Sequence, residues 1–176
     1  HQAVWKCFPH AKNRDFLTRI LADGSCFVLS RIQPSRPDWC PESGWKAKEI
    51  ASTFLDHTVY RFDLFANPTI RLLHDAQGRN YERGKEPRVP LIHVPLQQAW
   101  LERKGKAHGF CVQSLDIDPA RKLYFRRKGK QGLHVGVRFR GVLQVTDKQL
   151  FEKAFYTGIG GAKAFGFGML LLQPLH

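Results

Sequence analysis

The sequence lacks several features that would assign it to common classes of protein. No stretch approaches the roughly 18 consecutive apolar residues that a membrane-spanning helix needs. The longest apolar stretch, near Met169–Leu172, has only the length of a strand. No segment has the pattern of a secretory signal peptide. We therefore expect a cytoplasmic protein with no membrane partner.

Cysteine is sparse, and its spacing is uninformative. No two of the four cysteines have the C-x-x-C spacing that is typical of zinc sites and thioredoxin-like redox centres. We expect reduced, buried thiols, as in most cytosolic proteins, although the even number also permits disulfides. The cysteines are Cys7, Cys26, Cys40 and Cys111.

The carboxylates form no dense cluster of the kind that two-metal catalysis needs. Asp15, Asp63, Asp116 and Asp118 are dispersed along the sequence. A metal-dependent nuclease is therefore a weak hypothesis, and the sequence predicts neither a bound metal nor a cofactor.

Two familiar nucleotide-binding motifs are absent, although five glycines fall within Gly158–Gly168. Lys163 occupies the last glycine position of a G-x-G-x-x-G frame that begins at Gly158, and no G-x-x-x-x-G-K-[ST] is present. Glycines nevertheless permit positive φ and let backbone N–H groups approach a phosphate closely. Spacing alone leaves two interpretations open, a phosphate-binding loop and a tight connection between a helix and a strand.

Acidic residues are few, and one region contains none. The chain has 28 Lys and Arg against 15 Asp and Glu, a formal net charge of +13. Arg121–Arg140 contains eight basic residues and no acidic residue. A field of one sign attracts polyanions, and the release of condensed counterions then drives binding. Nucleic acid is the first candidate partner; a membrane surface is second, because the basic region has the pattern of strands rather than of an amphipathic helix.

What is present indicates a packed α+β fold, since 43% of the residues are apolar and 13 are Phe. In the second half a helix follows Pro95, and Gly109–Ile117 has the pattern of a strand. Val135–Leu143 alternates buried and cationic positions. Thr146–Gln149 has capping-box form ahead of another helix, and Phe165–Leu172 is apolar enough for a central strand. This order is that of a ferredoxin-like (βαββαβ) fold.

The first half is less regular. Arg14–Leu21 has the pattern of a helix, and Cys26–Arg31 and Val59–Leu64 have the pattern of strands. Asp75–Glu86 is polar and contains glycine, so it predicts an exposed connector and a domain boundary. We expect two tandem ferredoxin-like domains, residues 1–87 and 88–176. The first fits this order only if a strand precedes His1, so it is incomplete at its N-terminus.

Four segments together make the sequence recognisable. The glycine-rich segment reads G-I-G-x-A-K-x-x-G-x-G and is followed by L-L-L-Q-P-L. The others are His1–Pro9 with Arg14–Leu17, Tyr60–Thr69 with its A-N-P, and Arg88–Leu91 with Ala99–Arg103. In this order, across the whole chain, they resemble the CasE family of CRISPR-associated endoribonucleases.

The resemblance implies both a fold and a reaction. The fold is two ferredoxin-like domains. The reaction is cleavage of the long CRISPR transcript at the base of each repeat hairpin, without a metal. The 2′-hydroxyl of the RNA is the nucleophile, and the product carries a 2′,3′-cyclic phosphate. The mature guide RNA stays bound and enters the Cascade complex, so CRISPR repeat RNA and other Cascade subunits are the expected partners.

His1 is the expected catalytic residue, because H-Q-x-x-W-x-x-F-P aligns it with the family's histidine. An imidazole titrates near neutral pH, so it suits the transfer of a proton from the 2′-hydroxyl or to the departing 5′-oxygen. Such assistance typically contributes about 10²–10⁴-fold to the rate. Family members also have a strand and an assisting tyrosine upstream of this histidine. We therefore expect the natural protein to begin earlier, and a chain starting at His1 to be less stable and weakly active.

The basic region predicts a hairpin with a cationic tip and outer face. A duplex RNA stem presents phosphates and 2′-hydroxyls, which Arg and Lys can track. Tyr124 and Phe125 could stack on a base. The expected RNA-binding residues are Arg126, Arg127, Lys128, Lys130, Arg138, Arg140, Gly158, Gly160 and Lys163.

Two other functions remain open at this stage. The first is a non-catalytic protein of the same fold that binds an RNA hairpin without cutting it. The second is a ribosomal-type or other general nucleic-acid-binding protein, which would bind unrelated hairpins as tightly as the repeat.

Overall fold

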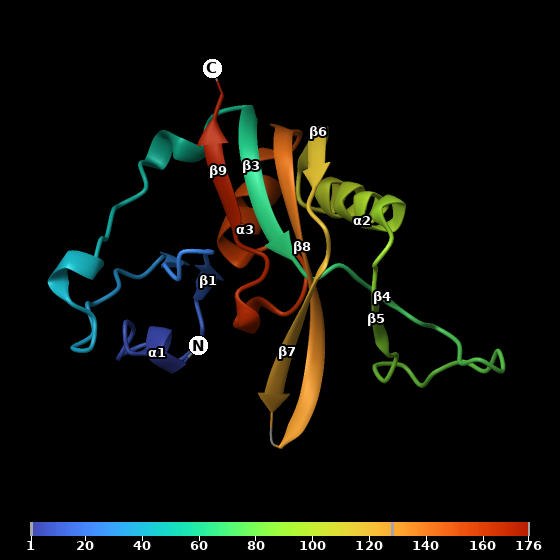
Figure 1. Ribbon diagram of the computed structural model, residues 1–176. Coiled ribbons are helices and arrows are strands. Elements are labelled where there is room, and N and C mark those ends of the chain that lie inside the picture. The colour runs from blue at the N-terminus through green and yellow to red at the C-terminus, as the bar shows by residue number, and fades with distance from the viewer. Residues whose placement is uncertain (1, 128, 176) are drawn as a thin grey trace.

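A computed structural model describes residues 2–127 and 129–175 (Figure 1). The side chains of Gln2, Arg127 and Lys130 are not described. The elements are α1 (Gln2–Trp5), β1 (Phe16–Ile20), β2 (Cys26–Ser30), η1 (Glu42–Gly44), η2 (Ser52–Leu55), β3 (Val59–Ala66), β4 (Thr69–Arg71), β5 (Arg88–Pro90), α2 (Val94–Ala107), β6 (Phe110–Ile117), β7 (Arg121–Arg127), β8 (Lys130–Val145), α3 (Lys148–Thr157), η3 (Lys163–Phe165) and β9 (Leu170–Pro174).

The main sheet has the strand order β6-β8-β3-β9, and all its neighbours are antiparallel. In chain order its elements are β3, α2, β6, β8, α3 and β9, which is the ferredoxin-like βαββαβ sequence. Buried side chains of β3 and β8 pack with Trp100 and Leu101 of α2 and with Phe151 and Phe155 of α3 in one core. The α+β class and the ferredoxin-like fold are confirmed.

Strand β3 precedes the expected domain boundary in the sequence but lies inside the main sheet. A division at residue 87 assigns β3 to the first domain, whereas β3 pairs with β8 through Val59–Ala66 and with β9 through Tyr60–Leu64. Dividing the chain at residue 87 would therefore remove an interior strand from its sheet. We propose that the second ferredoxin-like domain begins at β3.

The N-terminal part contributes α1 and the antiparallel hairpin β1–β2, with its own small core. Phe8 stacks on Phe16 with ring centroids 4.7 Å apart, and Trp5 meets Phe16 edge-on at 5.2 Å. Among the residues described, these elements correspond to part of a βαββαβ unit.

Three local predictions were wrong. Arg14–Leu21 is not a helix, because β1 is buried from Phe16 to Arg19 and pairs with β2 across the Asp23-Gly24 turn, where Gly24 has φ 83°. The C-terminal strand β9 is an edge strand, since it pairs with β3 alone. The cap of α3 is Asp147 rather than Thr146, because the Asp147 carboxylate accepts a hydrogen bond from the N–H of Leu150.

Other predictions were confirmed. Pro95 lies in the first turn of α2, Gly109–Ile117 contains β6, and Asp75–Glu86 is the connector between β4 and β5. All four cysteines are free thiols as expected, but the expected burial is wrong for two of them, since Cys7 and Cys40 are buried whereas Cys26 and Cys111 are exposed. None of the helices described is long and apolar enough to cross a membrane.

Candidate nucleic-acid interface

The predicted basic hairpin is formed by β7 and the first part of β8. The two strands pair from Arg121↔Gly136 to Arg127↔Lys130. Figure 1 shows them extending away from the main sheet as a two-stranded arm, while the rest of β8 continues into the sheet. The Phe125 ring lies across Gly132, where an added Cβ would come within 2.2 Å of its Cζ. Glycine at that position therefore permits the close contact between the two strands.

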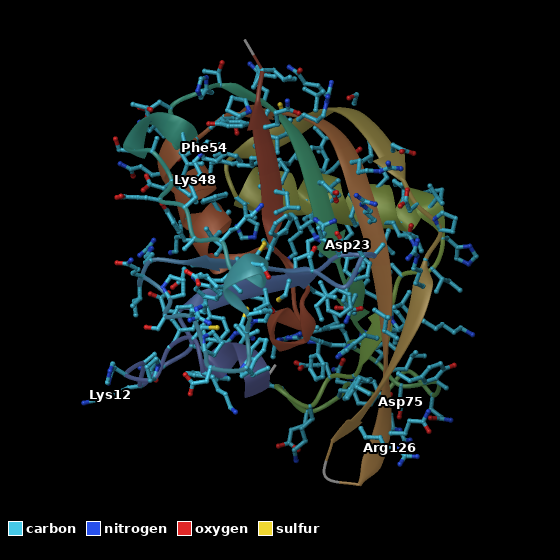
Figure 2. The ribbon with its side chains drawn as sticks, turned by 60° about the vertical axis from the view of Figure 1, so that its left-hand side comes forward. Lys12, Asp23, Lys48, Phe54, Asp75 and Arg126 are labelled. Atoms are coloured by element: carbon cyan, nitrogen blue, oxygen red, sulfur yellow. The ribbon has the colours of Figure 1, made fainter. Side chains whose placement is uncertain are left out.

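The hairpin carries its free charges on β7 and near its tip. Arg121, Lys122 and Arg126 are exposed, and Figure 2 places Arg126 toward the outer end of the arm. Lys128 lies outside the described residues, and the side chains of Arg127 and Lys130 are not described. Tyr124 is 65% exposed, so its ring is available for stacking.

Arg138 is already paired with a carboxylate. Its guanidinium donates to Asp63 at 2.6 Å and 3.0 Å, and Arg19 of β1 donates to the same carboxylate at 2.6 Å. Burial opposes ionisation of Asp63, but hydrogen bonds from the two arginines outweigh it and hold its pKa below the ordinary value. Asp63 thus neutralises part of the cationic face that the alternation in β8 predicts.

Arg140 is paired in the same way, because its Nη2 lies 2.7 Å from oxygens of both Asp116 and Asp118. A groove of about 590 Å³ opens on this face, and its lining mixes Arg61 and Arg140 with Asp63 and Asp116. The absence of acidic residues between positions 121 and 140 gave no sign of these pairs, since the carboxylates lie on β3, on β6 and just after β6.

The glycine-rich segment is closely packed and has backbone angles that favour glycine. Gly158 caps α3 with φ 76°, and Gly160 has φ 83°. An added Cβ at Gly160 would lie 3.0 Å from Cζ2 of Trp100. The N–H of Ile159 donates to the carbonyl of Gly168, which closes the segment into a loop. Glycine is therefore needed here for packing, and the same loop holds Lys163 at the start of η3.

Basic side chains from three distant segments surround this loop. Arg14 donates through Nη2 to the Lys163 carbonyl at 2.7 Å, and Nη1 of Arg88 lies 3.2 Å from an ideal Cβ on Gly161. Nζ of Lys104 lies 5.9 Å from the centroid of Trp100, the ring that contacts Gly160. No motif in the sequence predicted a role for these three residues. The available signal was that each lies in, or next to, a segment that carries the family resemblance.

An aromatic cluster joins the hairpin to the glycine-rich segment. The His134 ring stacks on Phe125 at 4.5 Å and meets Phe165 at 4.6 Å. Nδ1 of His134 lies 3.1 Å from Nδ2 of Asn67, while His134 Nε2 and Asn67 Oδ1 are buried and have no hydrogen-bond partner among the described residues. Burial lowers the pKa of His134. The hairpin is thus fixed to η3 by ring contacts.

His1 lies outside the described residues. The chain immediately after it forms α1, whose Trp5 packs on Phe16 of β1. Arg14, just before β1, reaches the carbonyl of Lys163. The N-terminal segment and the glycine-rich segment are therefore neighbours in space.

Comparisons with known proteins agree with this arrangement. The family model described as CRISPR associated protein matches residues 1–174. The CRISPR system Cascade subunit CasE of Escherichia coli (strain K12) is 34% identical over 184 residues, which cover 99% of this chain and 90% of that protein. The crystal structure of Cas6e from Escherichia coli str. K-12 has a TM-score of 0.74 at 31% identity and the same coverage of both chains.

A structure of CRISPR endoribonuclease Cse3 bound to 19 nt RNA has a TM-score of 0.75 at 27% identity. It covers 99% of this chain and 88% of that one. With a family model spanning nearly every residue and a relative above 30% identity over the whole length, the chain belongs to the family of CRISPR associated proteins.

Proposed function

We propose that this chain is an endoribonuclease that binds the hairpin of a CRISPR repeat and cleaves the precursor transcript to give mature guide RNA. The observation that carries the proposal is the similarity, over 99% of the chain, to an endoribonuclease solved with bound RNA. The exposed basic hairpin and the glycine-rich loop with its surrounding cations support it, because an RNA backbone is recognised mainly by positive charge.

The proposed RNA-binding surface has two parts. Arg126, Arg127, Lys128 and Lys130 at the hairpin tip would contact the phosphates of the stem. Gly158, Gly160 and Lys163 would shape and charge the loop beside it. For Arg138 and Arg140 we propose a secondary role, since each must exchange a carboxylate partner for a phosphate.

The proposed reaction is transesterification with His1 as the acid–base residue. The 2′-oxygen bonds to phosphorus, the bond from phosphorus to the 5′-oxygen breaks, and the product carries a 2′,3′-cyclic phosphate. One proton leaves the 2′-hydroxyl and one is delivered to the 5′-oxygen, and an imidazole near its pKa can serve either transfer. No step in this scheme calls for a metal ion.

The proposed partners are the repeat RNA and other subunits of a Cascade complex, as the name of the Escherichia coli relative suggests. We propose the cytoplasm as the compartment, which agrees with four free thiols.

A digest of a repeat transcript in EDTA, followed by sequencing of the products, tests the proposal. We expect one cut at the base of the hairpin and a 2′,3′-cyclic phosphate end. His1→Ala should abolish cleavage but retain binding, whereas the matched control His10→Ala, at an exposed position, should cut normally. Undiminished cleavage by His1→Ala would refute the histidine assignment. Binding by the unaltered chain with no product would favour the non-catalytic alternative.

A further inference from the structure

Four cationic side chains lie around the glycine-rich loop, and we call this group the loop cation site: Arg14, Arg88, Lys104 and Lys163. The hydrogen bond from Arg14 to the Lys163 carbonyl and the approach of Arg88 to Gly161 define two of its sides. Lys104, above Trp100, defines the third. Burial, together with the charges of Lys104 and Lys163, lowers the pKa of His108 at the end of α2.

This site differs from the other arginine clusters because it has no carboxylate. Within residues 2–127 and 129–175, no salt bridge joins any of its four members to an acidic residue. Arg19, Arg138 and Arg140, by contrast, all have one. Burial lowers the pKa of both amines; repulsion from Arg103 and Arg88 lowers the pKa of Lys104 further, and repulsion from Lys104 and Arg14 lowers that of Lys163. A bound anion would remove that repulsion.

The glycine-rich loop has two further features that are typical of ligand-binding sites. Ala162 has φ 58°, and it is the one non-glycine residue with positive φ in the part of the chain that the structure describes. Strained residues of this kind cluster at ligand-binding sites. Next to it, Phe165 leaves 45% of its surface exposed although it sits among other rings. An exposed aromatic ring beside concentrated positive charge is typical of sites that bind single-stranded nucleic acid.

The distance from the hairpin tip makes this a separate binding site. Phe165 contacts His134, which lies four residues along β8 from Lys130 at the tip. At the rise of a strand, four residues span about 13 Å. One phosphate cannot contact both places. The rings that join Phe165 to Phe125 and His134 fix this separation.

We propose that the loop cation site binds a backbone phosphate of the unpaired RNA that flanks the repeat stem, with an adjacent base stacked on Phe165. This rests on the proposed function, since it presumes that the hairpin tip holds the stem. The site then adds affinity only for RNA that extends beyond the paired region.

The test compares two RNAs, a blunt repeat stem and the same stem with unpaired nucleotides on both sides. Binding is measured by fluorescence anisotropy over a series of salt concentrations. The variant is Arg88→Gln with Lys104→Gln, which spares Arg14 because its hydrogen bond supports the loop. The control is Lys46→Gln with Lys48→Gln, two exposed residues on another loop; Figure 2 shows Lys48 far from Arg126.

The unaltered chain should bind the flanked RNA more tightly and with a steeper salt dependence. The loop variant should lose this advantage, with the slope reduced by about 0.7 for each lost contact to single-stranded RNA. The loop variant should bind the blunt stem with the same affinity as the control variant. Phe165→Leu, which keeps every charge, should weaken binding of the flanked RNA without changing the slope.

Two outcomes would overturn the inference. In the first, the loop variant binds each RNA as tightly as the unaltered chain does. In the second, a loop variant with a normal thermal melt loses as much affinity for the blunt stem as for the flanked RNA. A failed proposed function looks different, because the unaltered chain would then show no preference for the repeat stem over an unrelated hairpin. If the double variant melts early, Lys104→Gln alone supplies the same comparison, since Lys104 makes no hydrogen bond among those found in the described residues.

Discussion

Asp63 holds two arginines, and replacing it by asparagine tests how much this arrangement stabilises the fold. The side chain of Arg19 is only 4% exposed, that of Asp63 is 21% exposed, and that of Arg138 is 42% exposed. Removing one partner of a buried ion pair typically costs about 3–5 kcal/mol. Because Arg138 reaches solvent and asparagine can still accept one hydrogen bond, we expect Asp63→Asn to cost about 3 kcal/mol, near the lower limit.

For a chain of this length, such a loss should lower the melting temperature by roughly 6–12 °C. The control is Glu82→Gln, whose partner is Lys85 at 2.6 Å with both side chains at least 70% exposed. Exposed pairs contribute about 0–1 kcal/mol, so this variant should melt within roughly 4 °C of the unaltered chain.

The pH dependence gives a second readout for Asp63. Because its folded-state pKa is depressed by Arg138 and Arg19, its contribution is fully present above the unfolded-state value of about 3.9 and is lost as pH falls through the lowered value. The difference between the unaltered chain and Asp63→Asn should be constant from neutral pH down to about 5 and should shrink in more acidic melts. Equal melting temperatures at pH 7 would refute the reasoning, and so would a difference that persists undiminished in acid.

Three further predictions address the interface. Replacing Arg126, Arg127 and Lys128 together by glutamine should flatten the salt dependence of RNA binding by about 0.7–0.9 per lost phosphate contact, and an unchanged slope would mean that the RNA lies elsewhere. Gly160→Val should lower the melting temperature more than Gly78→Val, because both glycines have φ near +80° but only Gly160 faces a ring, Trp100 at 3.0 Å; equal effects would show that strain alone matters. Burial lowers the pKa of His134, so its neutral form contributes stability that is present above about 6.5 and lost as pH falls. His134→Phe should therefore reduce the acid sensitivity of urea unfolding, and an unchanged pH profile would contradict the burial argument.

The fold could be predicted well where the local sequence determines a helix or strand without help from distant residues. The alternation from Val135 to Leu143 set the buried face of β8, and Pro95 set the start of α2. The prediction failed where tertiary contacts decide. Arg14–Leu21 has the spacing of a helix, but pairing with β2 and burial on both faces make it a strand.

The interface could be predicted only in part, for a similar reason. The sequence identified the basic hairpin and Lys163, because charge runs and glycine spacing are local signals. It did not reveal that Asp63 pairs with Arg138, which is 75 positions away, since that contact depends on strand register. It also did not show that Arg14, Arg88 and Lys104 lie around the glycine-rich loop, because residues far apart in the sequence come together only after folding.

The continuity of strand β8 bears on which RNA stems the chain can select. Strand β8 runs without interruption from the tip of the arm at Lys130 to Val145 in the centre of the main sheet, where it pairs with β3 and β6. Contacts of Phe125 and His134 with Phe165 also hold the arm beside the glycine-rich loop, so a swing of the arm would have to break them. If the arm and the loop bind the RNA as proposed, a stem with an extra or a missing base pair would move its end away from the glycine-rich loop. The chain should thus discriminate among RNA hairpins by the number of base pairs in the stem as well as by their sequence.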